Sequence, residues 1–594
     1  MNVNEGPGVL LSKVDGQVLA LDKELVLFRD NHSHSVHRFR RQEFLIFSSL
    51  RTSKSVEEHA QAARHISPQE SYDSLLQLLS SWLHKGLLLP LELPQGSPSG
   101  REPDRIGSIN VVTKDRPAHL KRCLVALGRN LSIHGRCTPV CVYDDSINRN
   151  AVATSEHLRT LRRSYPGELR YGGASRKLRR VSSLASASGL DTKLIHFAIF
   201  GLHDLSSYGA NLNCALLDSA DRSIVVLDDD VIVRTADMRS DSRLFMTTDA
   251  DPTRLTPFSS AALALQGLSW CEADFVALHE LMLGKSTVAL CQDPDVAQDI
   301  SSGEIGGRSR ALNLNGRVLL TMLGVAGASG SSQNSWFHLA RHAAPFTQED
   351  DDYRLLGTSP WVRRSVERVT ISDGGFFMNM CAGIHNHHLP PFFPVLRNMD
   401  GIFAAILFTC FRHATVGHLP WVIQHLPPTP KQLPRVAVSD DWGRLDPRLS
   451  DILIRVVQSA ASWLAGETAQ ERLHALAVYL GEVARLSCDS FDRWLLHECQ
   501  LYWSNRLMNL RFLAQSAKGC SMWRREIEGY TSAVEARLEI TRAPVVADIS
   551  HPTLSPPRVF QELLGLYGEL LIAWPSLQQI SAAEKDPDLQ IAVN

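Results

Sequence analysis

The sequence predicts an α/β protein whose central parallel-sheet domain is flanked by a small α+β unit and an all-helical C-terminal region. Between residues 106 and 428, apolar strand-like segments alternate with helical ones, which is typical of a parallel sheet covered on both faces. A Pro-, Gly- and Ser-rich linker, residues 94–105, sets residues 1–93 apart. Residues 435–594 show only helical periodicity, which predicts a separate helical domain.

The N-terminal unit shows turn and capping signals. Alternating apolar positions around Asp15 and Gly16 predict a β-hairpin. Three helices are expected after it, one near residues 36–50, one from Ser55 and one from Ser67, the last two with capping-box starts. We expect the hairpin and the three helices to pack together as a winged-helix-like module.

Composition narrows the class of protein. The 594 residues carry 61 basic against 63 acidic side chains, a net charge of -2, so no overall field favours nucleic acid or an anionic membrane. The eleven cysteines include no C-x-x-C pair, which favours reduced thiols. The first residues lack a basic segment followed by an apolar one, and no apolar run approaches the ~20 residues of a membrane span. We expect a cytoplasmic protein with no membrane span and no nucleic-acid partner.

Polar residues follow the strands of the central domain. The strands end in "SINVVT" (108–113), "TPVCVYD" (138–144) and "SIVVLDDD" (223–230), and a helix begins at Pro117. Ligands bind beyond the carboxyl ends of parallel strands, so these positions are candidates for binding. The residues gathered there are Thr113, Asp115, Arg116, Asp144, Asp145, Asp228, Asp229 and Asp230.

Three of these carboxylates are consecutive, in "LDDDVIV". Adjacent charges at ~4 Å cost about 4 kcal/mol per pair at an effective dielectric near 20. A divalent cation with oxygen ligands, Mg²⁺ or Mn²⁺, would relieve this repulsion. The alternative is a solvated acidic turn. The position at a strand end, with acidic residues at earlier strand ends, favours the cation.

Several segments in order resemble the motifs of GT-A fold glycosyltransferases, particularly the family 2 type. They are "INVVTKDRPAHLKRCL", "VCVYDDS", "GANLNCALLDSADRSIVVLDDDVIV", "DGGFFMNMCAGI" and "LRNMDGIF". The resemblance implies a Rossmann-like GT-A domain over 106–428 and a nucleotide-diphospho-sugar donor, most readily a UDP-sugar. It also implies a D-x-D motif, Asp228 and Asp230, that binds Mn²⁺ or Mg²⁺.

The resemblance assigns roles around the nucleotide. It places Thr113 and Arg116 beside the nucleotide and gives Asp144 or Asp145 the hydrogen bonds from the base. Asn213 matches the asparagine of the family's R-N-x-G helix, although Leu212 stands where the family has arginine.

Roles for the metal and for catalysis follow from the same motifs. Asp228 would contact the ribose or the metal, Asp230 the metal, and Asp229 would orient the turn. His425 would complete the metal site, with His418 as the next choice. Asp400, at the start of a predicted helix, is the candidate base for an inverting transfer; its alternative is an N-cap.

The segment "DGGFF" follows a predicted strand. Asp373, Gly374 and Gly375 would form the acceptor side of the site, because paired glycines let the backbone approach a sugar closely. A plain turn is the alternative.

The sequence thus predicts a metal-dependent glycosyltransferase of the hexosyltransferase type, acting on an unknown acceptor that is a glycan, small molecule or peptide. One alternative is a transferase of ribosomal peptide maturation, since the apolar spacing of residues 1–93 resembles PqqD-like leader-binding domains. Another is a non-catalytic nucleotide-sugar-binding protein, suggested by Leu212 and by Met399. The apolar stripes of the C-terminal helices indicate core packing, or alternatively a homodimer surface.

Overall fold

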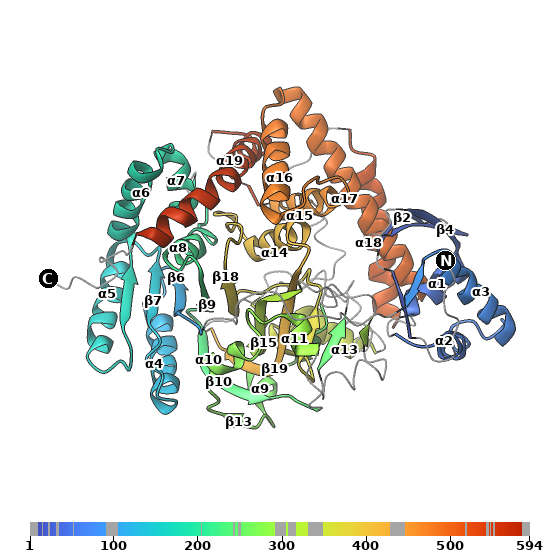
Figure 1. Cartoon of the computed structure of the whole chain (residues 1–594), viewed down its shortest axis with the longest axis horizontal. Coiled ribbons are helices and arrows are strands. Elements are labelled where there is room, and N and C mark those ends of the chain that lie inside the picture. Colours follow the sequence, from blue (N-terminus) through green and yellow to red (C-terminus); the bar gives the residue numbers. More distant parts are fainter. Residues whose placement is uncertain are drawn as a thin grey trace.

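The computed structural model is mixed α/β, with one large mixed sheet and a helical C-terminal region (Figure 1). It describes residues 10–14, 16–21, 24–30, 35–50, 53–90, 105–202, 205–240, 244–247, 251–291, 305–306, 316–330, 349–427, 446–516, 520–541, 546, 548–549 and 553–584. Almost the whole predicted linker, 94–105, therefore lies outside the described residues. No helix in the described part has the length and hydropathy of a membrane span.

The N-terminal unit has its own hydrophobic core. Phe39, Phe47 and Trp82 are buried there, and their rings lie within 4.9–5.8 Å of one another. The elements are β1 (Leu11–Lys13), β2 (Gly16–Leu21), β3 (Leu25–Asp30), β4 (Val36–Arg40), α1 (Arg41–Ser49), α2 (Val56–Ala63), α3 (Tyr72–His84) and β5 (Leu88–Pro90). An α+β unit is thus confirmed.

Several local predictions for this unit are wrong. The alternating segments on either side of Gly16 do not pair with each other: β1 pairs with β5, and β2 pairs with β3. Asp15 itself lies outside the described residues. Residues 36–40 form β4 instead of the start of a helix, because Phe39 alone faces the core between exposed neighbours.

The two predicted capping boxes have different outcomes. The box at Ser55 and Glu58 is confirmed at the start of α2. The helix expected from Ser67 begins at Tyr72, with Ser71 as its N-cap, because Ser67 accepts the backbone N–H of Glu70 in a preceding turn.

The central sheet is parallel at one side and mixed at the other. Its order there is β8-β7-β6-β9-β18-β15-β19, in which β6, β7, β8 and β9 are parallel. The strands are β6 (Ser108–Thr113), β7 (Val140–Asp144), β8 (Leu169–Gly172), β9 (Arg222–Asp228), β15 (Arg317–Ala328), β18 (Cys381–Asn386) and β19 (Ala414–His425). The chain runs from β6 outward to β8 and returns to β9 on the other side of β6. The strand order therefore reverses between β6 and β9.

Further strands belong to the same sheet, and short helices lie among them. The strands are β10 (Val231–Asp237), β11 (Phe245–Thr247), β12 (Arg254–Phe258), β13 (Trp270–Cys271), β14 (Ile305–Gly306), β16 (Trp361–Ser365) and β17 (Thr370–Ser372). The short helices among them are α9 (Ala261–Leu265), α10 (Phe275–Glu280), α11 (Thr287–Cys291) and α13 (Asp350–Thr358). Strand β10 pairs with β19, so the segment that follows the acidic triplet is part of the same sheet.

Helices cover both faces of the sheet. Alternate residues of β9 enter different cores: Val225 and Leu227 pack with α4 and α5, whereas Ile224 and Val226 pack with α6, α7, α8 and α14. These helices are α4 (Pro117–Ile133), α5 (Asn148–Arg162), α6 (Ala174–Ser188), α7 (Thr192–Phe200), α8 (Ala210–Asp218) and α14 (Met399–Cys410).

The C-terminal helices share one continuous core with the central domain. They are α15 (Leu449–Ala460), α16 (Ala469–Ala484), α17 (Cys488–Ser516), α18 (Ser521–Leu538) and α19 (Pro556–Ala583). Figure 1 shows α19 lying across α7 and α8. On α19, the Tyr567 hydroxyl donates to the Pro391 carbonyl (2.9 Å) and the Trp574 Nε1–H to the Leu389 carbonyl (2.9 Å). The helical prediction for 435–594 is confirmed in its described part, and these helices complete one face of the sheet.

Candidate active site

Polar loops meet where the strand order reverses. Strands β6, β7 and β9 end at Thr113, Asp144 and Asp228, so their carboxyl ends lie side by side. The backbone N–H of Asp145 donates to the Thr113 carbonyl (3.1 Å), which joins the first two loops. Crevices of this kind, at a topological switch point, are where ligands bind in open α/β sheets.

Asp229 faces the loop after β6. Its carboxylate accepts hydrogen bonds from the Thr113 hydroxyl (2.6 Å) and from Arg116 Nη1 (3.2 Å). Burial raises the pKa of Asp229 to about 6, against the opposing effect of these donors. Asp229 therefore contacts the site's own residues, in line with the expected orienting role.

Asp230 lies between a histidine and an arginine. Its oxygens are 3.0 Å from His425 Nε2 and 3.2 Å from Arg116 Nη1. Burial alone would raise the pKa of Asp230, but His425 and Arg116 outweigh it and lower that pKa. The same contact raises the pKa of His425, although burial opposes the rise.

Strand β19 brings His425 to this position from far along the chain. Its register with β15 shifts around Pro420, so that Leu419 pairs with Leu323 but Val422 with Gly324. This bulge accommodates a proline inside a central strand. At the end of β19, His425 pairs with Val231 at the start of β10, directly after the acidic triplet.

Asp228 and Asp400 are both carboxylates with raised pKa values. Burial and the neighbouring charges of Asp230 and Asp229 raise the pKa of Asp228 to about 7, and Asp400 adds to this rise. Burial raises the pKa of Asp400 to about 6. No hydrogen bond to the Asp228 carboxylate is found within the described residues.

Asp400 is not the N-cap of its helix. Asn398, in the left-handed region, occupies that place, and Asp400 lies in the first turn of α14. Its Oδ1 accepts the backbone N–H of Gly401 (3.0 Å). The alternative role as an N-cap is therefore wrong, and the carboxylate is close enough to Asp228 to influence its pKa.

Asp144 and Asp145 have different partners. Asp144 accepts the Ser146 backbone N–H (2.7 Å) and the Tyr171 hydroxyl (3.0 Å), and burial raises its pKa. Asp145 accepts the Ser207 hydroxyl (2.6 Å) and binds the ammonium of Lys177. Asp145 thus belongs to a charged cluster, whereas Asp144 is held by neutral donors.

Lys177 is a site residue that sequence reasoning missed. It is 1% exposed, and its ammonium contacts Asp145 and Asn211. Asn211 also donates from Nδ2 to the Thr113 carbonyl (3.4 Å). The available signal was the basic run "SRKLRR" directly after the strand that ends in Gly172, at the same edge of the sheet.

Asn213 lies away from this cluster. Its Nδ2 donates to the carbonyls of Ala198 (3.1 Å) and Phe392 (3.0 Å), and its Oδ1 accepts the Phe392 N–H (2.8 Å). The side chain is fully buried. Asn211, one position before Leu212, is the asparagine that faces the strand ends.

Asp373, Gly374 and Gly375 form a turn after β17. Both glycines have positive φ, +88° and +122°, and a Cβ at Gly374 would lie 2.2 Å from the ring of Phe408. The turn therefore requires glycine for its backbone and for close packing on α14. Its acceptor-side role stays a prediction.

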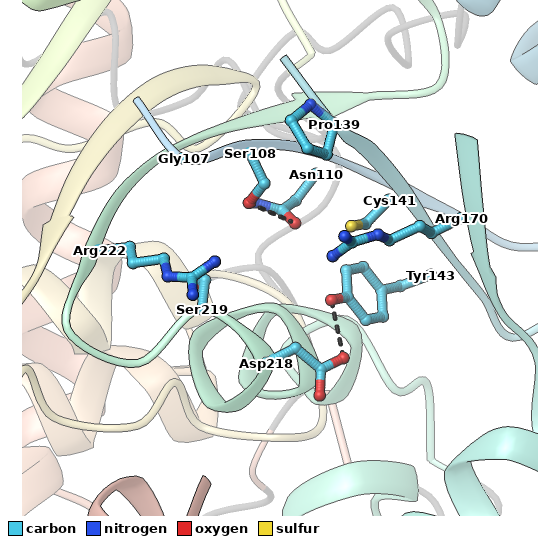
Figure 2. A pocket seen from close by; sticks show the side chains of 10 residues that line it. All are labelled: Gly107, Ser108, Asn110, Pro139, Cys141, Tyr143, Arg170, Asp218, Ser219 and Arg222. Atoms are coloured by element: carbon cyan, nitrogen blue, oxygen red, sulfur yellow. Dashed lines mark hydrogen bonds between the residues drawn. The ribbon is translucent and has the colours of Figure 1, made fainter. Parts of the chain in front are cut away.

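A small polar cavity lies at the opposite end of the strands (Figure 2). Its volume is about 30 Å³, enough for a water molecule but too small for a sugar nucleotide. Asp218 in its wall accepts the Tyr143 hydroxyl (2.9 Å) and Arg176 Nη2 (2.7 Å). This cavity is therefore part of the structural charge network at the amino edge and is not the candidate active site.

The residues present can supply part of a metal site. Asp230 Oδ1 and His425 Nε2 converge, and the other ring nitrogen of His425, Nδ1, lies 2.6 Å from the Ala328 carbonyl. A carbonyl that accepts Nδ1–H leaves Nε2 free as a ligand, which is common for metal-binding histidines. Within the described ranges no group of three or more His, Cys, Asp or Glu side chains could hold a metal ion. Substrate oxygens would have to complete the coordination.

Compared with models of known protein families, the sequence matches none, and no curated protein matches it either. Function must therefore be inferred from the residues of the site.

Proposed function

We propose that this protein is a metal-dependent glycosyltransferase that uses a nucleotide-diphospho-sugar donor, most readily a UDP-sugar. The observation that carries the proposal is the convergence of Asp228, Asp230, His425 and Asp400 at the switch point between β6 and β9. Elevated carboxylate pKa values and several acidic groups in one crevice are typical of functional sites. The motif segments that contain Thr113, Asp144 and Asp228 end side by side at this crevice.

The nucleotide would bind over the loops after β6 and β7. Thr113, Asp145 and Lys177 offer hydrogen-bond acceptors and donors there, and Arg116 lies beside Asp229 and Asp230. We assign the ribose and base to the loops after β6 and β7. The phosphates would then lie beside the acidic triplet, where the cation would bind.

A divalent cation, Mn²⁺ or Mg²⁺, fits the donor set of Asp230 and His425, with Asp228 beside them. When bound, it would neutralise the negative charge that develops on the leaving diphosphate. Without it, Arg116 Nη1 and His425 Nε2 both contact the Asp230 carboxylate, and this contact raises the pKa of His425. Binding of the cation would displace the proton from His425 Nε2.

Asp400 would act as the base. It would accept the proton of the acceptor hydroxyl as that oxygen attacks the anomeric carbon. A pKa of about 6 leaves it mostly ionised at pH 7 yet more basic than an exposed aspartate. The carboxylate is held by the Gly401 N–H, so its orientation is fixed before the acceptor binds.

Calorimetric donor binding, with and without Mn²⁺, tests this function. We expect UDP or a UDP-sugar to bind only weakly without Mn²⁺ and at least about tenfold more tightly with it, because a cation held by Asp230 would offset the negative charge of the phosphates. Asp230→Ala should abolish the gain. Asp237→Asn, at the other end of β10, removes an exposed pair with Arg239 and serves as the matched control. Binding that is independent of Mn²⁺ and unchanged in Asp230→Ala contradicts the metal assignment.

A second candidate is a transferase that glycosylates a peptide. The observation in its favour is the separate core of the N-terminal unit, which is typical of an autonomous binding module. Residues 10–90 would then hold the peptide, and the central domain would modify it. With a candidate precursor peptide, mass spectrometry should show transfer by the full chain and little by a chain lacking residues 1–93. Equal transfer by both chains contradicts this role.

A further inference from the structure

Arg397 is a cation with no acidic partner within the described residues. Its guanidinium lies 5.1 Å from the ring centre of Tyr208, which is 39% exposed. Arg397 precedes Asp400 by three residues, and Tyr208 follows Ser207, the partner of Asp145. The pair thus lies between the loop beside Asp145 and the helix that carries Asp400.

The backbone around Arg397 is held in an uncommon conformation. Leu396 and Asn398 on either side both have positive φ, +66° and +67°. Such values are uncommon outside glycine and are unfavourable, so they persist where the surrounding structure enforces them. The Leu396 N–H donates to the Ser206 carbonyl (2.8 Å), which fixes this turn to the loop of Tyr208.

Close backbone contacts make the Arg397–Tyr208 pair rigid. The N–H groups of Gly209 and Ala210 both donate to the Pro394 carbonyl (3.1 Å each). A Cβ on Gly209 would lie 2.0 Å from the Phe393 carbonyl oxygen, so only glycine permits this approach. The two loops therefore form one unit, and Arg397 keeps its place on the ring of Tyr208.

The charges of the site favour an additional cation. The cations Arg116, Lys177 and His425 are each already bonded to a carboxylate of the site. A nucleoside diphosphate adds two or three negative charges next to six aspartates, Asp144, Asp145, Asp228, Asp229, Asp230 and Asp400. The negative charges outnumber these three cations and one divalent ion, so an unpaired cation close to the phosphates would favour binding of the diphosphate.

We propose that Arg397, seated on Tyr208, binds the diphosphate of the nucleotide-sugar donor. The inference rests on the proposed function and gives a role to Arg397, which lies in the segment "LRNMDGIF" but to which the motif resemblance assigns none. A guanidinium binds phosphate oxygens through two parallel N–H groups, and stacking on an aromatic ring leaves that N–H edge open. Arg397 would thus supply a cation to a site whose motif has Leu212 in place of the expected arginine.

Calorimetry with nucleoside diphosphates and the matching nucleosides tests the proposal, in buffer with Mn²⁺. The probes are UDP, GDP, ADP and dTDP, and then the nucleoside of whichever binds best. We expect Arg397→Gln to weaken diphosphate binding about tenfold and nucleoside binding less than about twofold. Tyr208→Phe keeps the ring and should bind as wild type does. Arg234→Gln removes an arginine stacked on Trp270 outside the site and is the matched control.

The variant Arg397→Lys tests the proposal even if Arg397→Gln does not fold. It keeps the charge but loses the planar fork, so we expect about a threefold loss of diphosphate affinity with an unchanged melting temperature. Unchanged diphosphate affinity in both Arg397 variants overturns the proposal, as does an equal loss for diphosphate and nucleoside. A wild-type chain that binds none of the probes overturns the proposed function itself, which is a different result from normal binding by the variants.

Discussion

Carboxylates at the two ends of the parallel strands have opposite electrostatic environments. At the amino end, Asp218 accepts bonds from Tyr143 and Arg176, and Arg180 lies 3.7 Å away. At the carboxyl end, Asp228 lies against other carboxylates and its pKa rises to about 7. The amino edge thus uses charge to hold the fold together. The carboxyl edge stores unfavourable charge that a cation and a ligand would relieve.

The largest effect that tests this contrast is on stability, at the amino edge. Asp218→Asn removes the carboxylate that Arg176 and Arg180 share, although Arg180 keeps its pair with Glu584, so the free energy of unfolding should fall by about 3 kcal/mol. Urea denaturation measures this fall. Donor affinity of the folded fraction should stay unchanged. Loss of less than about 1 kcal/mol, as expected for the exposed pair broken in Asp237→Asn, would remove the distinction between the two edges.

At the carboxyl edge the largest expected effect is on catalysis. Asp400→Asn removes the proposed base, so the rate of transfer should fall about a thousandfold, while donor affinity changes less than about twofold. Product formation and calorimetry measure the two quantities separately. An undiminished rate would show that Asp400 only supports the first turn of α14.

A smaller effect, of opposite sign to that of Asp218→Asn, is expected at Asp228. Its raised pKa means that the folded state holds a proton more tightly than the unfolded state. The resulting destabilisation is absent below the unfolded pKa near 4 and complete above about 7. Asp228→Asn should therefore raise the free energy of unfolding by about 2 kcal/mol at pH 8 and hardly at all at pH 4. Denaturation in EDTA, which removes bound cations, measures this; equal effects at both pH values would contradict it.

The smallest effect is on the pH profile of the wild type. With a pKa of about 6, Asp400 gains a proton as the pH falls through 6, so the transfer rate should drop about tenfold per pH unit below it. A rate profile at saturating donor measures the midpoint. The residual rate of Asp400→Asn should be flat over the same range, and a persisting midpoint near 6 in that variant would assign it to another group.

Sequence alone predicts the strands whose residues are buried on both faces. Strands β6, β7 and β9 are continuous apolar runs that end in polar residues, so their ends and the acidic triplet could be located from local pattern. This pattern is local, so it does not show which distant segments of the chain come together. The approach of Asp400 to Asp228 depends on α14 packing behind the sheet, which no spacing encodes.

Lys177 and Asn211 show why the rest of the site could not be predicted. Helix α6 has few apolar residues and many Ser and Arg, and Lys177 is buried by residues distant in sequence, Asp145, Asn211 on α8 and the ring of Phe200. A motif match favours Asn213, but residues two apart on a helix point in different directions. Asn213 therefore faces Phe392 while Asn211 faces the strand ends.

Helix α19 has a consequence for biosynthesis. It completes the face of the sheet formed by α6, α7 and α8, yet about 380 residues separate its start from that of α6. At about 5–20 residues per second the ribosome needs roughly 20–80 s to make that interval. During this time the apolar surface awaiting Tyr567 and Trp574 has no native cover. A stalled or shortened nascent chain is therefore expected to engage chaperones at this face, whereas the N-terminal unit can fold as soon as it emerges.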